Sequence, residues 1–162
     1  GTEQDGLYSG GVLFSWNGTT YSYSLDLNAS GTSVNLTGYA YLSFRACQMT
    51  QHALNIDSDD DLTFSVRLED GAGAMSDAIG IGVYGGGIQD TFQRIGSNFS
   101  ECGATPGWTS EFEVVRIRLT DFTHDNPSLD LSNIAAIRFD FGPGFGSSSG
   151  RIALDEIEIT SD

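Results

Sequence analysis

The last apolar segment of the chain, residues 151–159, constrains the fold strongly because its alternation of apolar and polar residues changes phase once. Ile152 and Leu154 occupy one phase of a two-residue repeat, whereas the isoleucines at positions 157 and 159 occupy the other. Successive side chains of a strand point to opposite faces, so both pairs can be buried together only if the strand contains one extra residue. The segment therefore predicts a β-bulge at Asp155-Glu156.

Seven further segments show apolar residues at every second position, the pattern of a strand with one buried face. They are residues 12–16, 21–27, 39–47, 62–68, 78–84, 112–119 and 134–141. Glycine is frequent, with 21 residues, and no stretch has the period of a long helix. About eight strands that each have one apolar face predict an all-β fold, an antiparallel β-sandwich of two sheets. The length fits one domain, residues 1–162.

The charge of the chain limits its partners. Twenty-two acidic residues face seven basic residues, all arginine, and give a formal net charge of −15. This balance disfavours binding to nucleic acid or to anionic membranes. The apolar runs are also too short to span a membrane. A surface of this kind suits calcium binding or a salty environment.

The two cysteines, Cys47 and Cys102, allow one disulfide bond. An even number of cysteines is typical of secreted domains, so we expect a bond between them. The alternative is one buried and one exposed thiol. Two cysteines and two distant histidines do not form a zinc site.

The order of several motifs resembles the galactose-binding-like jelly roll of many non-catalytic carbohydrate-binding modules. The motifs are YLSFR at 41–45, LTFSVRLED at 62–70, VRIRLTDF at 115–122, LDLSNI at 129–134, IRF at 137–139 and LDEI at 154–157. The resemblance covers most of the chain from about Tyr21 onward and mainly concerns the architecture. It implies a secreted module that is attached to a polysaccharide-degrading enzyme or a peptidase.

The resemblance also implies a structural calcium ion. In the family, the aspartate of the closing strand commonly holds calcium together with residues near the amino terminus, and Asp155 matches that position. Glu3 and Asp5 are candidate partners by their location. The bulge leads to a similar expectation, because it places a carboxylate out of phase, where it needs a partner such as a cation.

A sugar site is expected where an aromatic ring lies on an open surface, because pyranose rings stack on flat aromatic faces. Gly80 and Gly82 leave a bare strand surface beside a tyrosine, and further aromatic and arginine side chains follow. The predicted ligand-binding residues are Tyr84, Phe92, Arg94, Trp108 and Arg45. The alternative is that a loop packs over the glycines, that Trp108 closes the edge of the core, and that most arginines pair with acidic residues.

We expect a non-catalytic, monomeric module that binds a polysaccharide or oligosaccharide and targets an attached enzyme. One alternative is an accessory or protein-interaction domain of a secreted peptidase or surface protein, with no glycan site. Another is a polysaccharide lyase or glycoside hydrolase, because Glu156 and Glu158 share a face. Their spacing departs from the signature of jelly-roll hydrolases. The G-x-S-x-G pattern at 146–150 joins two strands, so it lacks the context of a catalytic serine.

Overall fold

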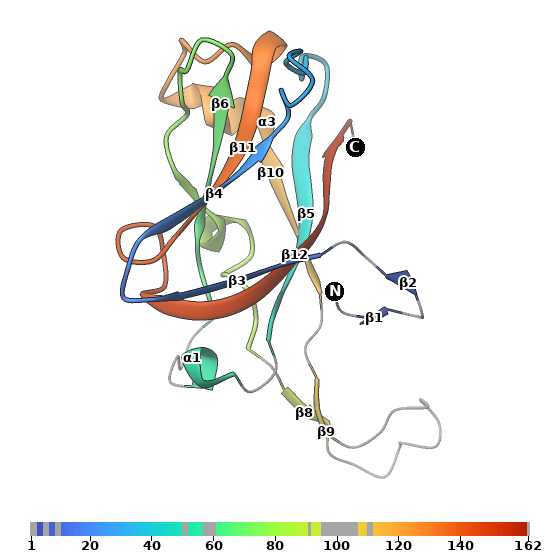
Figure 1. Ribbon diagram of the computed structural model, residues 1–162, viewed down its shortest axis with the longest axis vertical. Helices are drawn as coiled ribbons and strands as arrows, with labels where there is room; N and C mark the ends of the chain where they lie inside the picture. Colours follow the sequence, from blue (N-terminus) through green and yellow to red (C-terminus); the bar gives the residue numbers. More distant parts are fainter. Residues whose placement is uncertain are drawn as a thin grey trace.

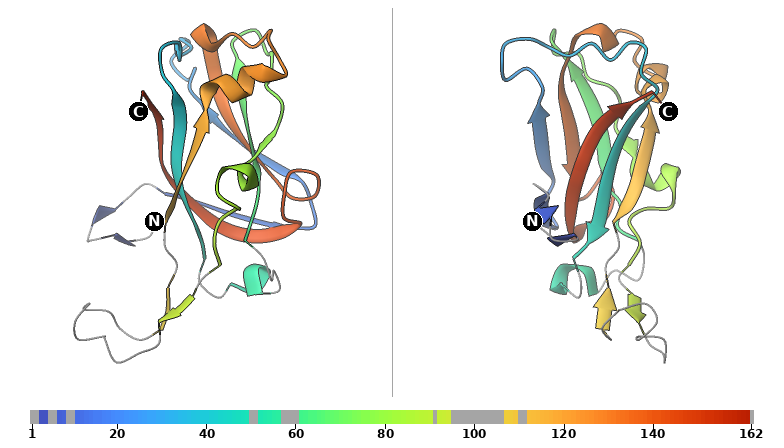
Figure 2. Two further views of the ribbon diagram at one scale, coloured as in Figure 1. Left: turned by 180° about the vertical axis from the view of Figure 1, so that it is seen from behind. Right: turned by 90° about the vertical axis from the view of Figure 1, so that its right-hand side faces the viewer.

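A computed structural model describes residues 3–4, 7–8, 11–49, 52–56, 61–90, 92–94, 107–109 and 112–161. For residues 3–4, 7–8, 56, 92–94 and 107–109 only the backbone is described. Two antiparallel four-stranded sheets lie face to face (Figures 1 and 2), which confirms the predicted β-sandwich. One sheet has the strand order β10-β5-β12-β3, and the other has the order β4-β11-β6-β7.

The first sheet contains β3 (Val12–Asn17), β5 (Tyr41–Gln48), β10 (Glu113–Arg118) and β12 (Ser149–Thr160). The second contains β4 (Tyr21–Asp26), β6 (Ser65–Asp70), β7 (Ile79–Gly80) and β11 (Ile134–Phe141). Two small ribbons, β1 (Glu3–Gln4) with β2 (Leu7–Tyr8) and β8 (Phe92–Arg94) with β9 (Gly107–Thr109), lie outside these sheets. The short helices among the described residues are α1 (Ala53–Ile56), η1 (Ile81–Tyr84), α3 (Leu119–His124) and η2 (Leu131–Asn133).

The core lies between the two sheets and consists of the apolar positions that the alternation predicts. The inward residues of the segment at 62–68, which are Leu62, Phe64, Val66 and Leu68, are all fully buried. Rings from both sheets meet there; Phe44 contacts Phe139 edge to face, with ring centroids 5.5 Å apart. Edge-to-face packing is favoured by the quadrupoles of the rings and adds to the free energy of burial.

The β-bulge in β12 is confirmed. The register of β12 against β5 shifts between Asp155 and Glu158, and Glu156 has a φ of 47°, in the left-handed region. Beyond the bulge, Ile157 and Ile159 pack against the same core as Leu154. The bulge also bends β12, which is visibly curved in Figure 1.

The segment at 78–84 differs from the sequence-based prediction. It begins as β7 but turns at Ile81 into the 3-10 helix η1. Val83, expected in the core, has 79% of its surface exposed. Alternating glycine and apolar residues look like a strand, but glycine equally permits a tight helical turn, so the pattern alone does not decide.

The predicted disulfide bond is not formed at Cys47, which is a free and buried thiol. Cys102 lies outside the described residues. Burial raises the pKa of Cys47 to about 11, so the thiol stays protonated at neutral pH and resembles a small apolar core residue. The expected pairing from an even number of cysteines is therefore wrong for Cys47 in this structure, and the alternative of a buried thiol holds for this residue.

The backbone at Glu156 leads to a first prediction. A left-handed conformation costs a non-glycine residue about 1–2 kcal/mol, and most for a β-branched one. Glu156→Gly and Glu156→Val both remove the carboxylate, so comparing them isolates the backbone. We expect Glu156→Val to have a free energy of unfolding about 1–2 kcal/mol below that of Glu156→Gly in urea titrations. Equal stabilities would show that the bulge does not need this conformation.

Candidate functional site

Tyr84, the central residue of the predicted sugar site, is committed to the protein interior. Its half-buried ring packs against the core, and its hydroxyl donates a hydrogen bond to the Asp121 carboxylate on α3. Burial, together with this bond, raises its pKa to about 12. The ring is therefore not a free stacking platform, and we leave Tyr84 out of the candidate site.

Three other predicted residues meet on the small ribbon of β8 and β9. Phe92 lies opposite Thr109, and Arg94 lies opposite Gly107, while Trp108 lies opposite Gln93. The backbone pairing therefore brings Phe92, Arg94 and Trp108 together on one ribbon. Their side chains lie outside the described residues, and their role in binding stays a prediction.

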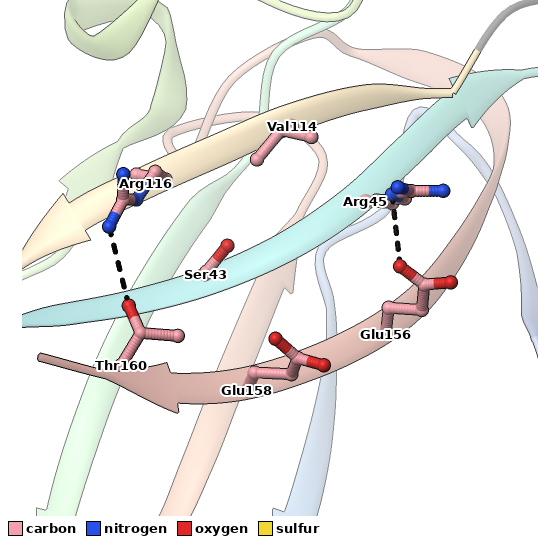
Figure 3. Close-up of a pocket in the computed structure, with 7 residues that line it drawn as sticks. All are labelled: Ser43, Arg45, Val114, Arg116, Glu156, Glu158 and Thr160. Atoms are coloured by element: carbon pink, nitrogen blue, oxygen red, sulfur yellow. Dashed lines mark hydrogen bonds and ion pairs between the residues drawn. The ribbon is translucent and has the colours of Figure 1, made fainter. Parts of the chain in front are cut away.

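Arg45 lies on the other sheet. It points outward from β5, and its Nε lies 3.0 Å from the Oε2 of Glu156 (Figure 3). This face is turned away from Gly80, because Gly80 belongs to the opposite layer of the sandwich. The structure thus separates Arg45 from the glycine-lined surface at Gly80.

The glycine-lined surface that the sequence predicts does exist, but its aromatic residue is Phe145. A pocket of about 270 Å³ is lined by Thr63, Phe64, Ser65, Gly80, Gly82, Val83, Phe145 and Gly146. Phe145 lies in the loop between β11 and β12, flanked by glycines. The criterion that was applied to Tyr84, an aromatic residue beside glycines, would have found it.

The loop that carries Phe145 is fixed against the sheet. The Ser147 amide donates to the Thr63 carbonyl (3.0 Å), and the Thr63 amide donates to the Ser147 hydroxyl (2.9 Å). The indole of Trp16 donates to the Ser147 carbonyl (2.8 Å). Gly146 has a φ of 147°, and a Cβ there would lie 2.3 Å from the Thr63 carbonyl oxygen. Only glycine allows so close an approach.

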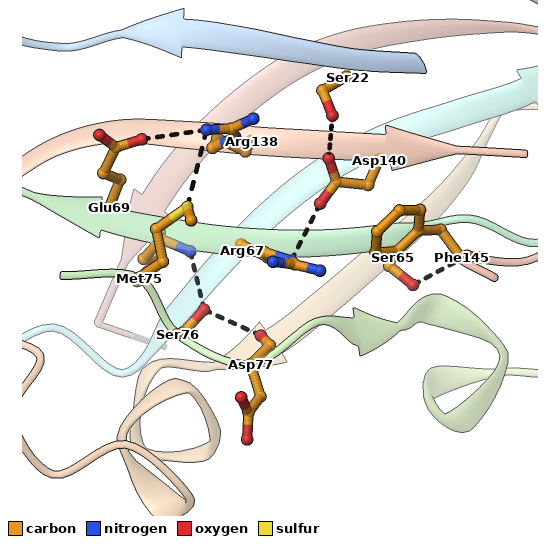
Figure 4. Close-up of polar contacts among 11 residues, drawn as sticks. Ser22, Ser65, Arg67, Glu69, Met75, Ser76, Asp77, Arg138, Asp140 and Phe145 are labelled. Atoms are coloured by element: carbon orange, nitrogen blue, oxygen red, sulfur yellow. Dashed lines mark hydrogen bonds and ion pairs between the residues drawn. The ribbon is translucent and has the colours of Figure 1, made fainter. Parts of the chain in front are cut away.

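Beside Phe145, the outer face of the second sheet carries two crossed ion pairs (Figure 4). Arg67 on β6 lies opposite Arg138 on β11, an unfavourable pair of like charges. Each arginine instead reaches diagonally to a carboxylate on the other strand. The Nε of Arg67 lies 3.0 Å from the Oδ2 of Asp140, and the Nη1 of Arg138 lies 3.4 Å from the Oε2 of Glu69.

The two ion pairs differ in burial. The side chain of Asp140 is only 4% exposed, and it also accepts a hydrogen bond from the Ser22 hydroxyl. The side chains of Arg138 and Glu69 are both about a third exposed, at 31% and 32%. The Arg67 pair is therefore largely shielded from solvent, whereas both groups of the Arg138 pair are accessible.

We call this surface the arginine face and define it as Ser22, Arg67, Glu69, Arg138, Asp140 and Phe145. The guanidinium of Arg67 lies over the Phe145 ring, 5.0 Å from its centroid, and forms an ion pair with Asp140. Among the described residues, no acceptor is bonded to the Nη groups of Arg67, so these donors are available. The face has planar hydrogen-bond donors and acceptors whose charges cancel. It also has an aromatic ring beside the pocket that the glycines leave open.

The predicted calcium site is described only in part. The Oδ1 of Asp155 accepts a hydrogen bond from the Glu156 amide (2.8 Å), and its Oδ2 faces Gly11, where a Cβ would lie 3.7 Å away. The described residues contain no group of three or more histidine, cysteine or acidic side chains that could hold a metal ion. Asp5 and the side chain of Glu3 lie outside the described residues.

The fold is similar to that of known carbohydrate-binding modules. A crystal structure of a family 30 carbohydrate-binding module matches with a TM-score of 0.63 and 15% sequence identity, covering 99% of this chain and 71% of that chain. A second is a module named CBM28, described as specific for non-crystalline cellulose, with a TM-score of 0.55, 11% identity and coverage of 99% and 80%. No protein-family model and no curated protein sequence matches the chain.

These similarities confirm the architecture that the resemblance implies: the chain has the β-sandwich fold of carbohydrate-binding modules. At such low sequence identity they concern the fold, and the ligand has to be argued from the surface itself. Among the described residues, no helix is long and apolar enough to cross a membrane.

The different burial of the two ion pairs leads to a second prediction. Asp140→Ala leaves the largely covered Arg67 without its countercharge, so we expect the free energy of unfolding to fall by about 2–3 kcal/mol. Glu69→Ala breaks a partly exposed pair and should cost about 1 kcal/mol or less. Urea titrations of both variants test the difference. Similar losses for both would contradict the structural role of Asp140.

Proposed function

We propose that the protein is a non-catalytic module that binds a neutral polysaccharide or oligosaccharide on the arginine face. The observation that carries the proposal is the pocket beside Phe145, which Gly80 and Gly82 leave open within an electroneutral, planar polar surface. A sugar ring can place an apolar face against Phe145 while its hydroxyls bond the guanidinium and carboxylate groups. The similarity in fold to carbohydrate-binding modules supports this proposal.

The charged residues of the face favour binding over catalysis. Glycoside hydrolysis uses two carboxylates with separate roles as acid and as base or nucleophile. Here Asp140 is held by Arg67 and Ser22, and Glu69 is held by Arg138. Both carboxylates thus serve as hydrogen-bond acceptors in a preorganised surface. In this proposal the module is secreted and directs an attached enzyme to its substrate.

A second candidate function is binding of a protein partner. The paired arginine and carboxylate groups that suit a sugar also suit a polar protein interface, and Met75 and Val83 add exposed apolar surface near the same face, 37% and 79% exposed. A protein partner does not require the pocket at Gly80 to stay empty of side chains. The test below therefore separates the two functions.

Gly80→Val is the sharpest test of the sugar site. Gly80 has φ −69° and ψ 125°, and a Cβ would lie 4.0 Å from its nearest contact, the Ser65 hydroxyl. Valine is thus accommodated without backbone strain but fills the pocket. We expect hydroxyethylcellulose, xyloglucan or glucomannan in a native gel to slow the migration of the wild type. Gly80→Val should need at least ten times more polysaccharide for the same retardation.

The matched control is Ala29→Leu, which adds an isopropyl group at an exposed turn position outside the arginine face. It should leave retardation unchanged, and both variants should melt within a few degrees of the wild type. Wild-type protein that is retarded by none of the neutral polysaccharides would overturn the sugar proposal. Retardation that Gly80→Val leaves unchanged would move the site away from the arginine face.

We also propose that a calcium ion binds at Asp155. The support is local: Oδ2 of Asp155 and the Leu154 carbonyl both border Gly11, where the missing side chain leaves room. Calcium takes six to eight oxygen ligands, so Glu3, Asp5 or backbone carbonyls of the amino-terminal segment would have to complete the shell. In a chain with a net charge of −15, a divalent cation would also relieve self-repulsion.

Chelation tests the calcium proposal. A ligand that binds only the native state stabilises it by about 2.7 kcal/mol at a hundredfold excess over its Kd. EDTA should therefore lower the melting temperature by several degrees, and calcium should restore it. Asp155→Asn keeps an acceptor for the Glu156 amide and should melt at the same temperature with and without EDTA. A wild-type melt that EDTA does not change would contradict the site.

A further inference from the structure

The opposite outer face of the sandwich carries a second, separate hollow, which we call the bulge groove. It has a volume of about 290 Å³ and lies over β10, β5 and β12 (Figure 3). Its lining residues are Ser43, Arg45, Val114, Arg116, Glu156, Glu158 and Thr160. It shares no residue with the arginine face, because it belongs to the other sheet.

The groove arises from one small residue between two large charged ones. Ser43 on β5 lies opposite Arg116 on β10 and opposite Glu158 on β12. Arg116 and Glu158 therefore flank Ser43 from the two neighbouring strands, and no ion pair joins them in the part of the chain that the structure describes. The serine hydroxyl forms the floor between them. The gap has donors on one side, acceptors on the other and Val114, 55% exposed, along its edge.

Two bridges close the ends of the groove. At one end the Nε of Arg45 lies 3.0 Å from the Oε2 of Glu156. At the other end the Nη2 of Arg116 lies 3.5 Å from the Thr160 hydroxyl, while its guanidinium lies over the Tyr41 ring, 4.4 Å from the centroid. Among the described residues, Glu158 has no such partner. The groove thus presents one free carboxylate between two oriented guanidinium groups.

The β-bulge creates this arrangement. Glu156 is the extra residue, and its left-handed backbone carries a conformational cost. Because the bulge returns Ile157 and Ile159 to the core, it also places Glu158 and Thr160 on the outer face. Strained residues often lie at functional sites, and here the strained residue itself lines the hollow.

The charge of the groove selects its ligand. Arg45 and Arg116 balance Glu156 and Glu158, so the groove is neutral within a chain of net charge −15. An anionic ligand would be repelled by the chain as a whole, and a cation would meet two guanidinium groups. A neutral ligand rich in hydroxyl groups satisfies both the donors and the acceptors. The volume is near the lower end for small-ligand pockets and suits about one sugar ring.

We propose that the bulge groove is a second saccharide-binding site, which binds a neutral sugar unit between Arg116 and Glu158. The proposal rests on the proposed function for the kind of ligand, but it concerns a different face and different residues. A module with a site on each outer face could hold two glycan chains, or two parts of one chain, with a gain in avidity that depends on their separation.

Amide chemical shifts of the full chain, titrated with cellohexaose and with xylohexaose to several millimolar, test the proposal. We expect two sets of shifts, one around Arg67 and Phe145 and one around Ser43 and Glu158. Glu158→Gln should weaken binding at the bulge groove about tenfold, because a hydrogen bond to a charged acceptor becomes one to a neutral acceptor. Binding at the arginine face should stay unchanged.

Ser43→Phe fills the groove from its floor and should abolish the second set of shifts; Gly80→Val should abolish only the first. Asp125→Asn, an exposed carboxylate outside both sites, is the charge-matched control and should alter neither. If the residues of the groove do not shift with either sugar, this inference is overturned, whatever the arginine face does. If the residues of the groove shift and those of the arginine face do not, the second site is supported and the face assigned in the proposed function is wrong.

Discussion

The single extra residue in β12 determines much of the molecule. β12 pairs with β3 on one side and β5 on the other, and its side chains alternate between the core and one outer face. Without the bulge, Ile157 and Ile159 would point to solvent and lose their contacts with the core. Burying an isoleucine contributes about 1.5–3 kcal/mol, whereas a left-handed residue costs about 1–2 kcal/mol. The balance favours the bulge, and the outward position of Glu158 follows from it.

The two outer faces both carry arginine and carboxylate side chains, but they arrange them differently. On the arginine face, two opposed arginines avoid each other by reaching diagonally, and the carboxylates between them are held in place. In the bulge groove, Arg116 and Glu158 flank the small side chain of Ser43 without pairing, and Arg116 contacts Thr160 and Tyr41, so the Glu158 carboxylate is left for a ligand. The register of the strands accounts for the difference. On the arginine face it places a carboxylate diagonal to each arginine, and in the bulge groove it places Ser43 between the arginine and the glutamate.

The sequence predicts those features that depend on local alternation. The limits of β11, the buried residues of the segment at 62–68 and the bulge at Asp155-Glu156 all follow from a two-residue period and its interruption. The turn of Ile81 into η1 could not be predicted, because alternating glycines fit a strand and a tight helix equally well. Phe145 could have been singled out as an aromatic residue between glycines, but its place beside Gly80 depends on distant contacts, since Thr63 and Trp16 hold the loop there.

The placement of the arginines connects the two faces with the acidity of the chain. Of the seven arginines, Arg67 and Arg138 lie on one outer face, and Arg45, Arg116 and Arg118 lie on the other. These two faces therefore hold five of the seven positive charges of a chain whose net charge is −15. A neutral polysaccharide gains nothing from this field, whereas anionic polymers are kept away from both faces. The two faces thus favour ligands that offer hydroxyl groups rather than charge. Such ligands can form hydrogen bonds with the local guanidinium and carboxylate groups, and the net charge of the chain does not repel them.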